Sequence, residues 1–288
     1  MLSYRHAFHA GSHADILKHV VLTLCLQHMN SKDKPYLVLD THAGAGLYAI
    51  DSVEAKKTGE YLDGIARLWN RNDLPAPMKP YMDALQVCSG GLKLRRYPGS
   101  PWLAAHFARE IDTLRFCELH STDFALLRRE FRDSGRRVKV EQHDGFEAMK
   151  AALPPPSRRG LVLIDPSYEI KSDYLKVIAA IRDGLKRFAT GSYLVWLPFL
   201  PSIEARALPE KLKKLPADWL YASLSVRGPA TKGQGMSGSA MFIVNPPWTL
   251  KSALEESLPW LAQMLALDEK AEWTVEGSHA GTAKPRAD

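Results

Sequence analysis

Residues 161–168 read Leu-Val-Leu-Ile-Asp-Pro-Ser-Tyr, an apolar run that ends in a carboxylate, two turn residues and an aromatic ring. A short, uninterrupted apolar run indicates a strand that is covered on both faces, as in a parallel sheet. Open α/β enzymes bind their ligands where such strands end. The stretch therefore predicts an α/β fold with functional groups at residues 165–168, although a plain strand-to-turn exit would have the same four residue types.

Strands and helices alternate along most of the chain, as in a doubly wound sheet. The apolar spacing predicts strands at 36–39, 114–119, 138–142, 161–164, 193–197, 220–226 and 240–244, and helices at 13–30, 122–131, 173–188 and 202–214. The last two strands are joined by residues 227–238, a loop too short for a helical crossover, so they should form an antiparallel pair at one edge. The sequence thus predicts a mostly parallel seven-stranded sheet with an antiparallel edge hairpin.

The alternation divides the chain into segments. Residues 1–47 should hold an N-terminal motif, a helix and the first strand, and residues 99–267 the remainder of the core. Between them, prolines interrupt short helical runs, which predicts a small helical insertion over residues 48–98. From Asp268 onward the chain is polar, alanine-rich and aperiodic, so a disordered tail is expected over residues 268–288.

The composition narrows the class of protein. A formal charge of +6 and a pI near 9.1 favour a polyanionic partner, since lysine and arginine neutralise phosphates. The three cysteines are odd in number and widely spaced, which fits a reducing cytoplasm rather than a disulfide framework or a zinc site. We expect no membrane span, because uninterrupted apolar runs stay short. The dense histidines 6, 9, 13 and 19 lack the spacing with an acid that zinc hydrolases use, so no metal is expected.

Acidic residues close the expected parallel strands: Asp40, Glu118, Asp144 and Asp165. The ends of parallel strands meet at one rim of the sheet, so these carboxylates should converge there. Glycines 44 and 46 allow a ligand to approach the first strand end, but the third glycine of the dinucleotide fingerprint is missing after Gly46. The pattern therefore favours S-adenosylmethionine, with Glu118 placed for its ribose hydroxyls and Asp144 for its adenine edge.

The end of the 161–168 stretch suits chemistry on an exocyclic amine. Asp165 and the carbonyl of Pro166 can accept its two N–H groups, and Tyr168 offers a ring on which an extruded base can stack. Held in this way, the nitrogen lone pair is turned toward an incoming methyl group. An adenine amine has little basicity, so positioning matters more than a strong general base.

Ordered motifs extend the interpretation to the whole chain apart from its tail. Residues 4–19, which read YRHAFHAGSHADILKH, together with residues 39–46, 58–66, 97–100, 158–168 and 244–248, resemble the RlmJ family of bacterial 23S rRNA adenine-N6 methyltransferases. The resemblance implies a Rossmann-like class I S-adenosylmethionine-dependent methyltransferase core. It also implies S-adenosylmethionine as methyl donor and an adenine of 23S rRNA as acceptor, in RNA that is protein-free or early in assembly. We expect a cytoplasmic monomer.

The same resemblance implies the roles of individual residues. The cofactor would be held by His19, His42, Ser100, Glu118, Asp144, Gly145 and Asp165. Tyr4, His6 and Lys18 would lie near the target base, and Asp165, Pro166 and Tyr168 would be the catalytic set. One departure is Ser167, where the family motif has proline; proline would stiffen the loop and help to aim the Pro166 carbonyl. We therefore expect slower or looser catalysis rather than inactivity.

A second motif competes for the catalytic role. Asn245, Pro246, Pro247 and Trp248 match the general adenine-methylase pattern more literally than residues 165–168 do. They end the last strand, however, which should run antiparallel and finish at the rim opposite the cofactor. We interpret them as a structural turn with Trp248 in the core.

Two other functions stay open at this point. A DNA adenine-N6 methyltransferase could share the core, although an insertion over 48–98 is small for reading duplex grooves. A catalytically weak RNA-binding protein could keep the fold, and Ser167 is the hint for it. Basic residues at 128–139, 158–159 and 211–214 favour an RNA track in either RNA-related case.

Overall fold

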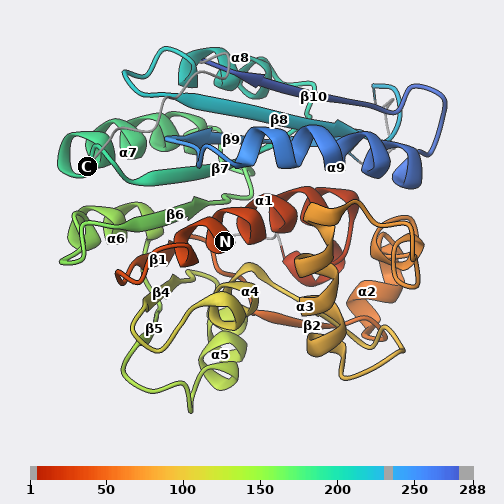
Figure 1. The fold of residues 1–288 in the computed structure, drawn as a ribbon, viewed down its shortest axis with the longest axis horizontal. Coiled ribbons are helices and arrows are strands. Elements are labelled where there is room, and N and C mark those ends of the chain that lie inside the picture. Colours follow the sequence, from red (N-terminus) through yellow and green to blue (C-terminus); the bar gives the residue numbers. More distant parts are fainter. Residues whose placement is uncertain (1–4, 230–235, 279–288) are drawn as a thin grey trace.

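A computed structural model describes residues 5–229 and 236–278 (Figure 1). An eight-stranded sheet has the order β10-β8-β9-β7-β6-β1-β4-β5. Its strands are β1 (Leu37–Asp40), β4 (Thr113–Cys117), β5 (Val138–Glu141), β6 (Gly160–Ile164), β7 (Ser192–Pro198), β8 (Trp219–Ser225), β9 (Gly238–Val244) and β10 (Glu272–Gly277). All seven predicted strands are present.

The direction of the strands confirms the mostly parallel sheet with an antiparallel edge. Strands β7, β6, β1, β4 and β5 run parallel to one another. Strand β9 lies between β7 and β8 and is antiparallel to both. The predicted hairpin of β8 and β9 is therefore formed, but its second strand is inserted into the sheet rather than placed outside it.

The eighth strand corrects the expectation for the C-terminal segment. Strand β10 pairs antiparallel with β8 along the sheet edge, with Glu272 opposite Ser225 and Gly277 opposite Leu220. The prediction of disorder from Asp268 onward is wrong for this strand, because backbone pairing to an open edge does not require an apolar sequence pattern. Residues 279–288 of the expected tail lie outside the described residues.

Helices cover both faces of the sheet. On one face, α6 (Gly145–Ala152), α7 (Asp173–Arg187) and α8 (Ile203–Leu212) share one hydrophobic cluster with the strands. On the other, α1 (His13–Asn30), α4 (Ser100–Phe107), α5 (Ser121–Glu130) and α9 (Leu250–Leu265) share a second, larger one. None of the helices in the described part of the chain is long and apolar enough to cross a membrane.

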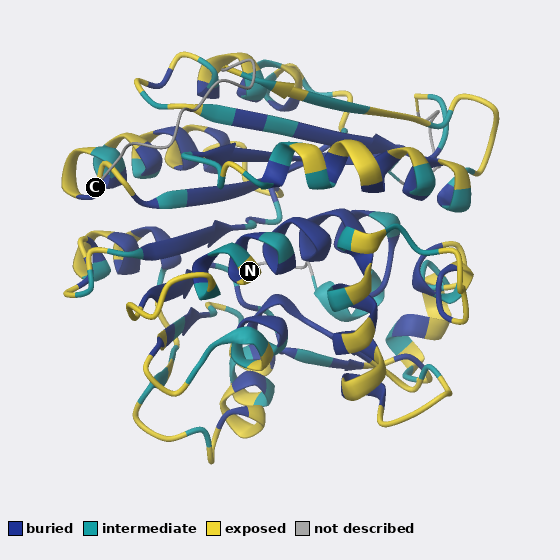
Figure 2. Cartoon of the chain, viewed as in Figure 1, coloured by how far each residue is buried: buried dark blue, intermediate teal, exposed yellow. Residues whose placement is uncertain are grey.

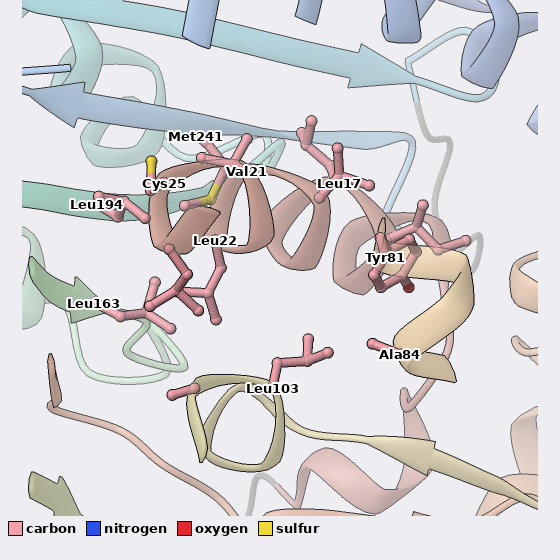
Figure 3. Packing of buried hydrophobic residues seen from close by; sticks show 14 of the residues in the cluster. Leu17, Val21, Leu22, Cys25, Tyr81, Ala84, Leu103, Leu163, Leu194 and Met241 are labelled. Atoms are coloured by element: carbon pink, nitrogen blue, oxygen red, sulfur yellow. The ribbon is translucent and has the colours of Figure 1, made fainter. Parts of the chain in front are cut away.

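Helix α1 is enclosed between the sheet and the insertion, and it is buried along most of its length (Figure 2). Figure 3 shows its side chains Val21, Leu22 and Cys25 packed among residues of the sheet, of α3 (Lys79–Ser89) and of α4. The sequence predicted its bounds correctly but suggested an amphipathic helix. Its polar residues Asp15 and Lys18 are instead buried, at 1% and 4% exposure.

Residues 47–98, which include the segment predicted to be an insertion and are called the insertion below, pack onto the start of α1. The insertion comprises β2 (Leu47–Ala49), α2 (Val53–Thr58), 3-10 turns at Ile65–Arg67 and Ala76–Met78, α3 (Lys79–Ser89) and β3 (Arg96–Pro98). Strands β2 and β3 pair with each other, a feature that the helical pattern did not predict. The amide of Ile65 donates to the carbonyl of Gly11 over 2.9 Å, and Tyr81 and Tyr97 belong to the same core cluster as α1.

The topology brings four predicted acids to one rim. Strands β6, β1, β4 and β5 are neighbours and parallel, so their carboxyl ends present Asp165, Asp40, Glu118 and Asp144 in that order. This arrangement is the one that the sequence predicts.

The competing motif lies at the other rim. The last residue of β9, Val244, pairs with Tyr193 near the beginning of β7. The side chain of Asn245 donates to the carbonyls of Ala189 and Gly191, both over 2.8 Å, as in a turn. Trp248 is 79% exposed, so its predicted place in the core is wrong. The chain turns outward before α9 begins, and the Trp248 ring lies edge-on to the ring of His28, with the centroids 6.4 Å apart.

Candidate active site

Two cavities meet at the end of β6. Cavity A runs along the rim and is lined by His6, Lys18, His19, His42, Ala43, Gly44, Tyr48, Gly99, Ser100, Glu118, His120, Asp123, Asp165 and Ser167. Cavity B opens beside it, between the start of α1, the insertion and the ends of β7 and β8; its lining includes His9, His13, Asp15, Glu60, Trp196 and Arg227. The residues that line both are His6, Lys18, Asp165 and Ser167.

A chain of polar contacts occupies this junction. Nε2 of His6 lies 2.9 Å from Oδ2 of Asp15, whose Oδ1 lies 2.9 Å from Nζ of Lys18. The same Nζ donates to Oδ2 of Asp165 over 2.6 Å. The side chains of Asp15 and Lys18 are 1% and 5% exposed, and that of Asp165 is 13% exposed. Helix α1 therefore brings a buried cation directly to the carboxylate at the end of β6.

The charged forms of Asp15, Lys18 and Asp165 stabilise one another. Burial opposes the charged forms of both Asp15 and Lys18, but their mutual attraction outweighs it. His6 and Lys18 hold the pKa of Asp15 well below its usual range, and Asp15 and Asp165 raise the pKa of Lys18. Burial raises the pKa of Asp165, while Lys18 counteracts that shift. Lys18 thus favours an ionised Asp165 in a setting that would otherwise neutralise it.

Tyr168 is placed differently from the stacking role expected for it. Its ring is 5% exposed and packs 4.6 Å from the ring of Tyr174, and its hydroxyl donates to the carbonyl of Trp196 over 2.8 Å. Its φ of 55° is unusual for a residue with a side chain. Ser167, rather than Tyr168, faces the two cavities. Stacking on a base would require the Tyr168 ring to leave this packing.

Asp40 and Ser100 form the middle of the rim. Ser100 Oγ donates to Oδ2 of Asp40 over 2.6 Å, and the amide of His42 donates to Oδ1 over 3.2 Å. Burial raises the pKa of Asp40 to about 7 despite these donors. Sequence reasoning placed Asp40 at the rim but left it out of the proposed cofactor set.

Glu118 is anchored to two loops. Its Oε2 accepts from the amide of Gly44 over 2.8 Å, and its Oε1 accepts from the amide of His120 over 2.7 Å. Gly44 has a φ of +61°, and a Cβ there would lie 2.4 Å from the hydroxyl of Tyr48, so glycine is required in this loop. Each carboxylate oxygen can accept a second hydrogen bond, and the side chain lines cavity A.

Asp144 and Gly145 begin α6. Oδ1 of Asp144 accepts from the amide of Phe146 over 2.8 Å and caps the helix. Gly145 lies so close to β1 that a Cβ would be 2.1 Å from the carbonyl oxygen of Thr41. Both residues therefore have structural roles, and neither lines cavity A or cavity B.

His42 lines cavity A as a neutral imidazole. Burial lowers its pKa to about 4. Thr41 Oγ1 donates its proton to the carbonyl of Leu163 over 2.9 Å, so His42 Nδ1, 2.8 Å from that oxygen, must be the donor to it. The other ring nitrogen, Nε2, is left as an acceptor.

His19 provides a test of whether cavity A suits a polar ligand. Its Nδ1 lies 3.0 Å from the hydroxyl of Tyr97, and burial lowers its pKa to about 3, so the ring is neutral. Its Nε2 is buried and has no hydrogen-bond partner in the described structure. A buried polar atom of this kind is costly unless a ligand satisfies it. Together with Lys18, Ser100 and Glu118, it gives the cavity the donors and acceptors that an amino acid joined to a nucleoside requires.

The structure thus brings most of the predicted residues together. His6, Lys18, His19, His42, Ser100, Glu118 and Asp165 all line cavity A, whereas Asp144 and Gly145 support it from the start of α6. Tyr4 lies outside the described residues. Sequence reasoning missed Asp15 and Tyr97. Asp15 was interpreted as an acid in the first turn of a helix, and only the packing of α1 shows that it is buried beside Lys18.

Known proteins resemble this chain over nearly its whole length. Residues 33–277 match the family model described as "Ribosomal RNA large subunit methyltransferase D, RlmJ". Ribosomal RNA large subunit methyltransferase J of Escherichia coli (strain K12) is 47% identical over 273 residues, which cover 92% of this chain and 94% of that protein. The Haemophilus influenzae protein of the same name is 45% identical over 278 residues, covering 96% and 98%.

A solved structure agrees with these matches. A crystal structure of a Legionella pneumophila protein superposes on this chain with a TM-score of 0.87 at 34% identity, and the match covers 94% of this chain and 99% of that one. Apart from the added edge strand β10, the strand order, in which antiparallel β9 lies between β7 and β8, is that of class I S-adenosylmethionine-dependent methyltransferases. The chain therefore belongs to the RlmJ family of ribosomal RNA large subunit methyltransferases.

Proposed function

We propose that the chain transfers the methyl group of S-adenosylmethionine to N6 of one adenine in 23S rRNA. The observation that carries this proposal is the meeting of cavities A and B at Asp165. A methyl donor in one cavity and a nucleobase in the other would face each other across this carboxylate.

Cavity A is the proposed cofactor site. Lys18 and the unpartnered Nε2 of His19 lie at the proposed amino-acid end, Glu118 provides acceptors for ribose hydroxyls, and His42 lies on the side of Asp144, toward the adenine end. Ser100, whose hydroxyl proton is bonded to Asp40, lines the same cavity. When bound, S-adenosylmethionine supplies an electrophilic methyl group. The protein's own task is to orient that group toward cavity B and to keep water away from it.

Cavity B is the proposed site of the target base. An amine that is paired in a duplex cannot enter it, so the adenine must be flipped or presented in a single-stranded segment. Oδ2 of Asp165 is already bound to Lys18, which leaves Oδ1 and the carbonyl of Pro166 to accept the two N–H groups. After transfer the nitrogen carries an extra proton, and the adjacent carboxylate of Asp165 can accept it. Lys18 and His6 line both cavities and lie beside the incoming base.

The surface and the cysteines support the remaining parts of the proposal. Arg128 and Arg129 at the end of α5, with Arg132 and Arg136 beyond it, are exposed and provide positive charge for an RNA backbone. A base that must be extruded favours protein-free 23S rRNA or an early assembly intermediate. The three cysteines are free and buried, in keeping with a reducing cytoplasm, where the protein would act as a monomer.

Methyl transfer in vitro tests the proposal. Tritiated S-adenosylmethionine is supplied with protein-free 23S rRNA or with duplex DNA, and the label is located by nuclease digestion. We expect N6-methyladenine in the RNA and none in the DNA. Asp165→Asn should reduce the rate at least ~100-fold, whereas Asn245→Ala, at the opposite rim, should retain it. Labelled DNA without labelled RNA, or tight RNA binding with no transfer by the unaltered protein, would replace the proposal by one of its two alternatives.

A further inference from the structure

The insertion reaches the cofactor cavity through a buried chain of hydrogen bonds. The hydroxyl of Tyr81, on α3, lies 2.9 Å from the hydroxyl of Tyr97, on β3. The Tyr97 hydroxyl in turn lies 3.0 Å from Nδ1 of His19, on α1, and the rings of Tyr97 and His19 stack at 5.5 Å. All three side chains are 0% exposed. Side chains from α3, β3 and α1 are therefore joined by hydrogen bonds that lead to the wall of cavity A.

The hydrogen bonds that join Tyr81, Tyr97 and His19 can be donated in either of two directions. If Tyr81 donates to Tyr97 and Tyr97 donates to His19, both hydroxyl protons are bonded and His19 carries its own proton on Nε2. In the reverse order, His19 Nδ1 donates to Tyr97 and Tyr97 to Tyr81. The Tyr81 proton then has no acceptor, since Tyr97 is its one hydrogen-bond partner in the described part of the chain. A buried hydroxyl proton without an acceptor costs about 1 to 3 kcal/mol, so the first order is favoured.

In the first arrangement, one polar group has no hydrogen-bond partner, and this group lies at the wall of cavity A. Nε2 of His19 would carry a proton and would be the only member of the chain without a partner among the described residues. His19 lines cavity A together with its neighbour Lys18, whose ammonium group is also a donor. S-adenosylmethionine presents a carboxylate at its amino-acid end, and a carboxylate accepts from donors only. The reverse tautomer would direct a lone pair at that carboxylate and repel it.

We propose that Tyr81 and Tyr97 are positioning residues: their hydroxyls fix His19 as the tautomer protonated on Nε2, which presents a neutral N–H donor to the carboxylate of the cofactor. The inference rests on the proposed function for the identity of the ligand, but not for the tautomer. It assigns a role to the insertion, which would couple α3 and β3 to cofactor affinity. Burial lowers the pKa of His19 to about 3, so the ring stays neutral and its tautomer matters at every working pH.

The tautomer is measured on the protein without ligand or RNA. Long-range ¹H–¹⁵N correlation spectra of imidazole-labelled protein separate a protonated from an unprotonated ring nitrogen. We expect His19 to show a protonated Nε2 in the unaltered protein, and Tyr97→Phe to introduce a substantial fraction of the other tautomer. A His19 signal with the proton on Nδ1 in the unaltered protein would overturn the inference, whatever the variants do.

Binding of S-adenosylhomocysteine, which has the same amino-acid end, is measured by calorimetry. Tyr97→Phe should raise the Kd about threefold to tenfold, and Tyr81→Phe by less, while kcat at saturating donor changes little. The matched control is Tyr193→Phe, which removes a buried hydroxyl that donates to the carbonyl of Phe188 in the other hydrophobic cluster. Equal Kd values in Tyr97→Phe and Tyr193→Phe would refute the positioning role. If Tyr97→Phe does not fold, the Tyr81→Phe spectrum and Kd decide.

The two proposals fail in different ways. Failure to methylate RNA, with the expected His19 tautomer and the expected Kd shifts, would reject the proposed function and leave the positioning role intact. Normal methylation by a protein whose His19 carries the proton on Nδ1 would reject the positioning role and leave the proposed function intact.

Discussion

Nζ of Lys18 lies 2.6 Å from Oδ2 of Asp165 and 2.9 Å from Oδ1 of Asp15, so one buried ammonium group bridges the buried carboxylate of Asp15 and the largely buried carboxylate of Asp165. The first contact joins residues 147 positions apart in the chain. It ties the N-terminal helix to the end of β6, where the two cavities meet. The stability of this part of the fold and the charge state of Asp165 thus depend on the same side chain.

Replacing Lys18 tests that dependence. Lys18→Met keeps most of the side-chain volume but leaves two carboxylates buried without their cation, which should lower the free energy of unfolding by about 3 to 5 kcal/mol. Methyl transfer should also be lost. Urea unfolding gives the first quantity, and the double variant Lys18→Met/Asp15→Asn should regain part of the stability but none of the activity. The control Lys79→Met, which breaks an exposed pair with Asp83, should change the stability far less; equal losses would contradict the role of burial.

Gly145→Ala tests the packing of α6 against β1. A Cβ there would lie 2.1 Å from the carbonyl oxygen of Thr41, so the helix must shift by enough to disturb the loop that carries His42. We expect a loss of several kcal/mol in stability and a weaker Kd for S-adenosylhomocysteine. Gly135→Ala is the matched control: its φ is +72° but nothing lies within 4 Å, so it should cost about 1 kcal/mol and leave the Kd unchanged. Gly145 has no such left-handed backbone, so equal effects of the two variants would contradict the role of its close approach to Thr41.

The carboxyl of Asp40 should give the stability a distinct pH dependence. Burial raises its pKa to about 7, whereas in the unfolded chain it titrates at about 3.9. Between these values the folded protein binds a proton that the unfolded chain does not. The contribution of Asp40 to the free energy of unfolding should therefore increase as the pH falls from 7 toward 4, by about 1.4 kcal/mol per pH unit.

Asp40→Asn isolates this contribution, because His19 and His42, whose pKa values are lowered by burial, destabilise the folded protein as the pH falls in both variants. Urea unfolding of the unaltered protein and of Asp40→Asn between pH 5.5 and 8.5 gives the difference. It should level off above about pH 8 and should change steadily below pH 7 in favour of the unaltered protein. Parallel profiles would mean that Asp40 stays ionised in the fold.

Ser167→Pro tests the rigidity of the loop that follows β6. Ser167 lines both cavities, and proline at this position would restrict its own φ and the preceding residue. The saved conformational entropy is about 0.4 to 1 kcal/mol, so the methylation rate should rise about twofold to fivefold with the same target adenine. Ser167→Ala, which removes only the hydroxyl, should not raise the rate. An unchanged rate in the proline variant would show that loop rigidity does not limit transfer.

The sequence predicted the parts of this fold that depend on local patterns. The strands could be predicted because segments such as 161–164 are apolar without interruption. The convergence of the four acids at one rim follows from the parallel direction of the strands alone; these acids are Asp40, Glu118, Asp144 and Asp165. Strand β10 was missed because its residues are polar or half-exposed and gain order only from the edge of β8.

Long-range packing decides the features that the sequence did not reveal. Asp15 has the spacing of an ordinary first-turn acid, and its burial beside Lys18 arises only when the insertion closes over α1. Tyr97 carries no local signal for its contact with His19, 78 positions away. The buried ring of Tyr168 reflects a left-handed backbone that no sequence rule predicts at that site. Exposed Trp248 shows the opposite error, in which an apolar residue was assigned to the core by type alone.

The central claim is that Asp165 directs methyl transfer to one adenine of 23S rRNA, and mapping N6-methyladenine in the 23S rRNA of cells that lack this protein tests it most directly. The account predicts that one methylated adenine becomes unmodified, that the unaltered protein and Asn245→Ala restore it, and that Asp165→Asn, expressed at the same level, does not. A methylation map identical with and without the protein, or full restoration by Asp165→Asn, would contradict the account.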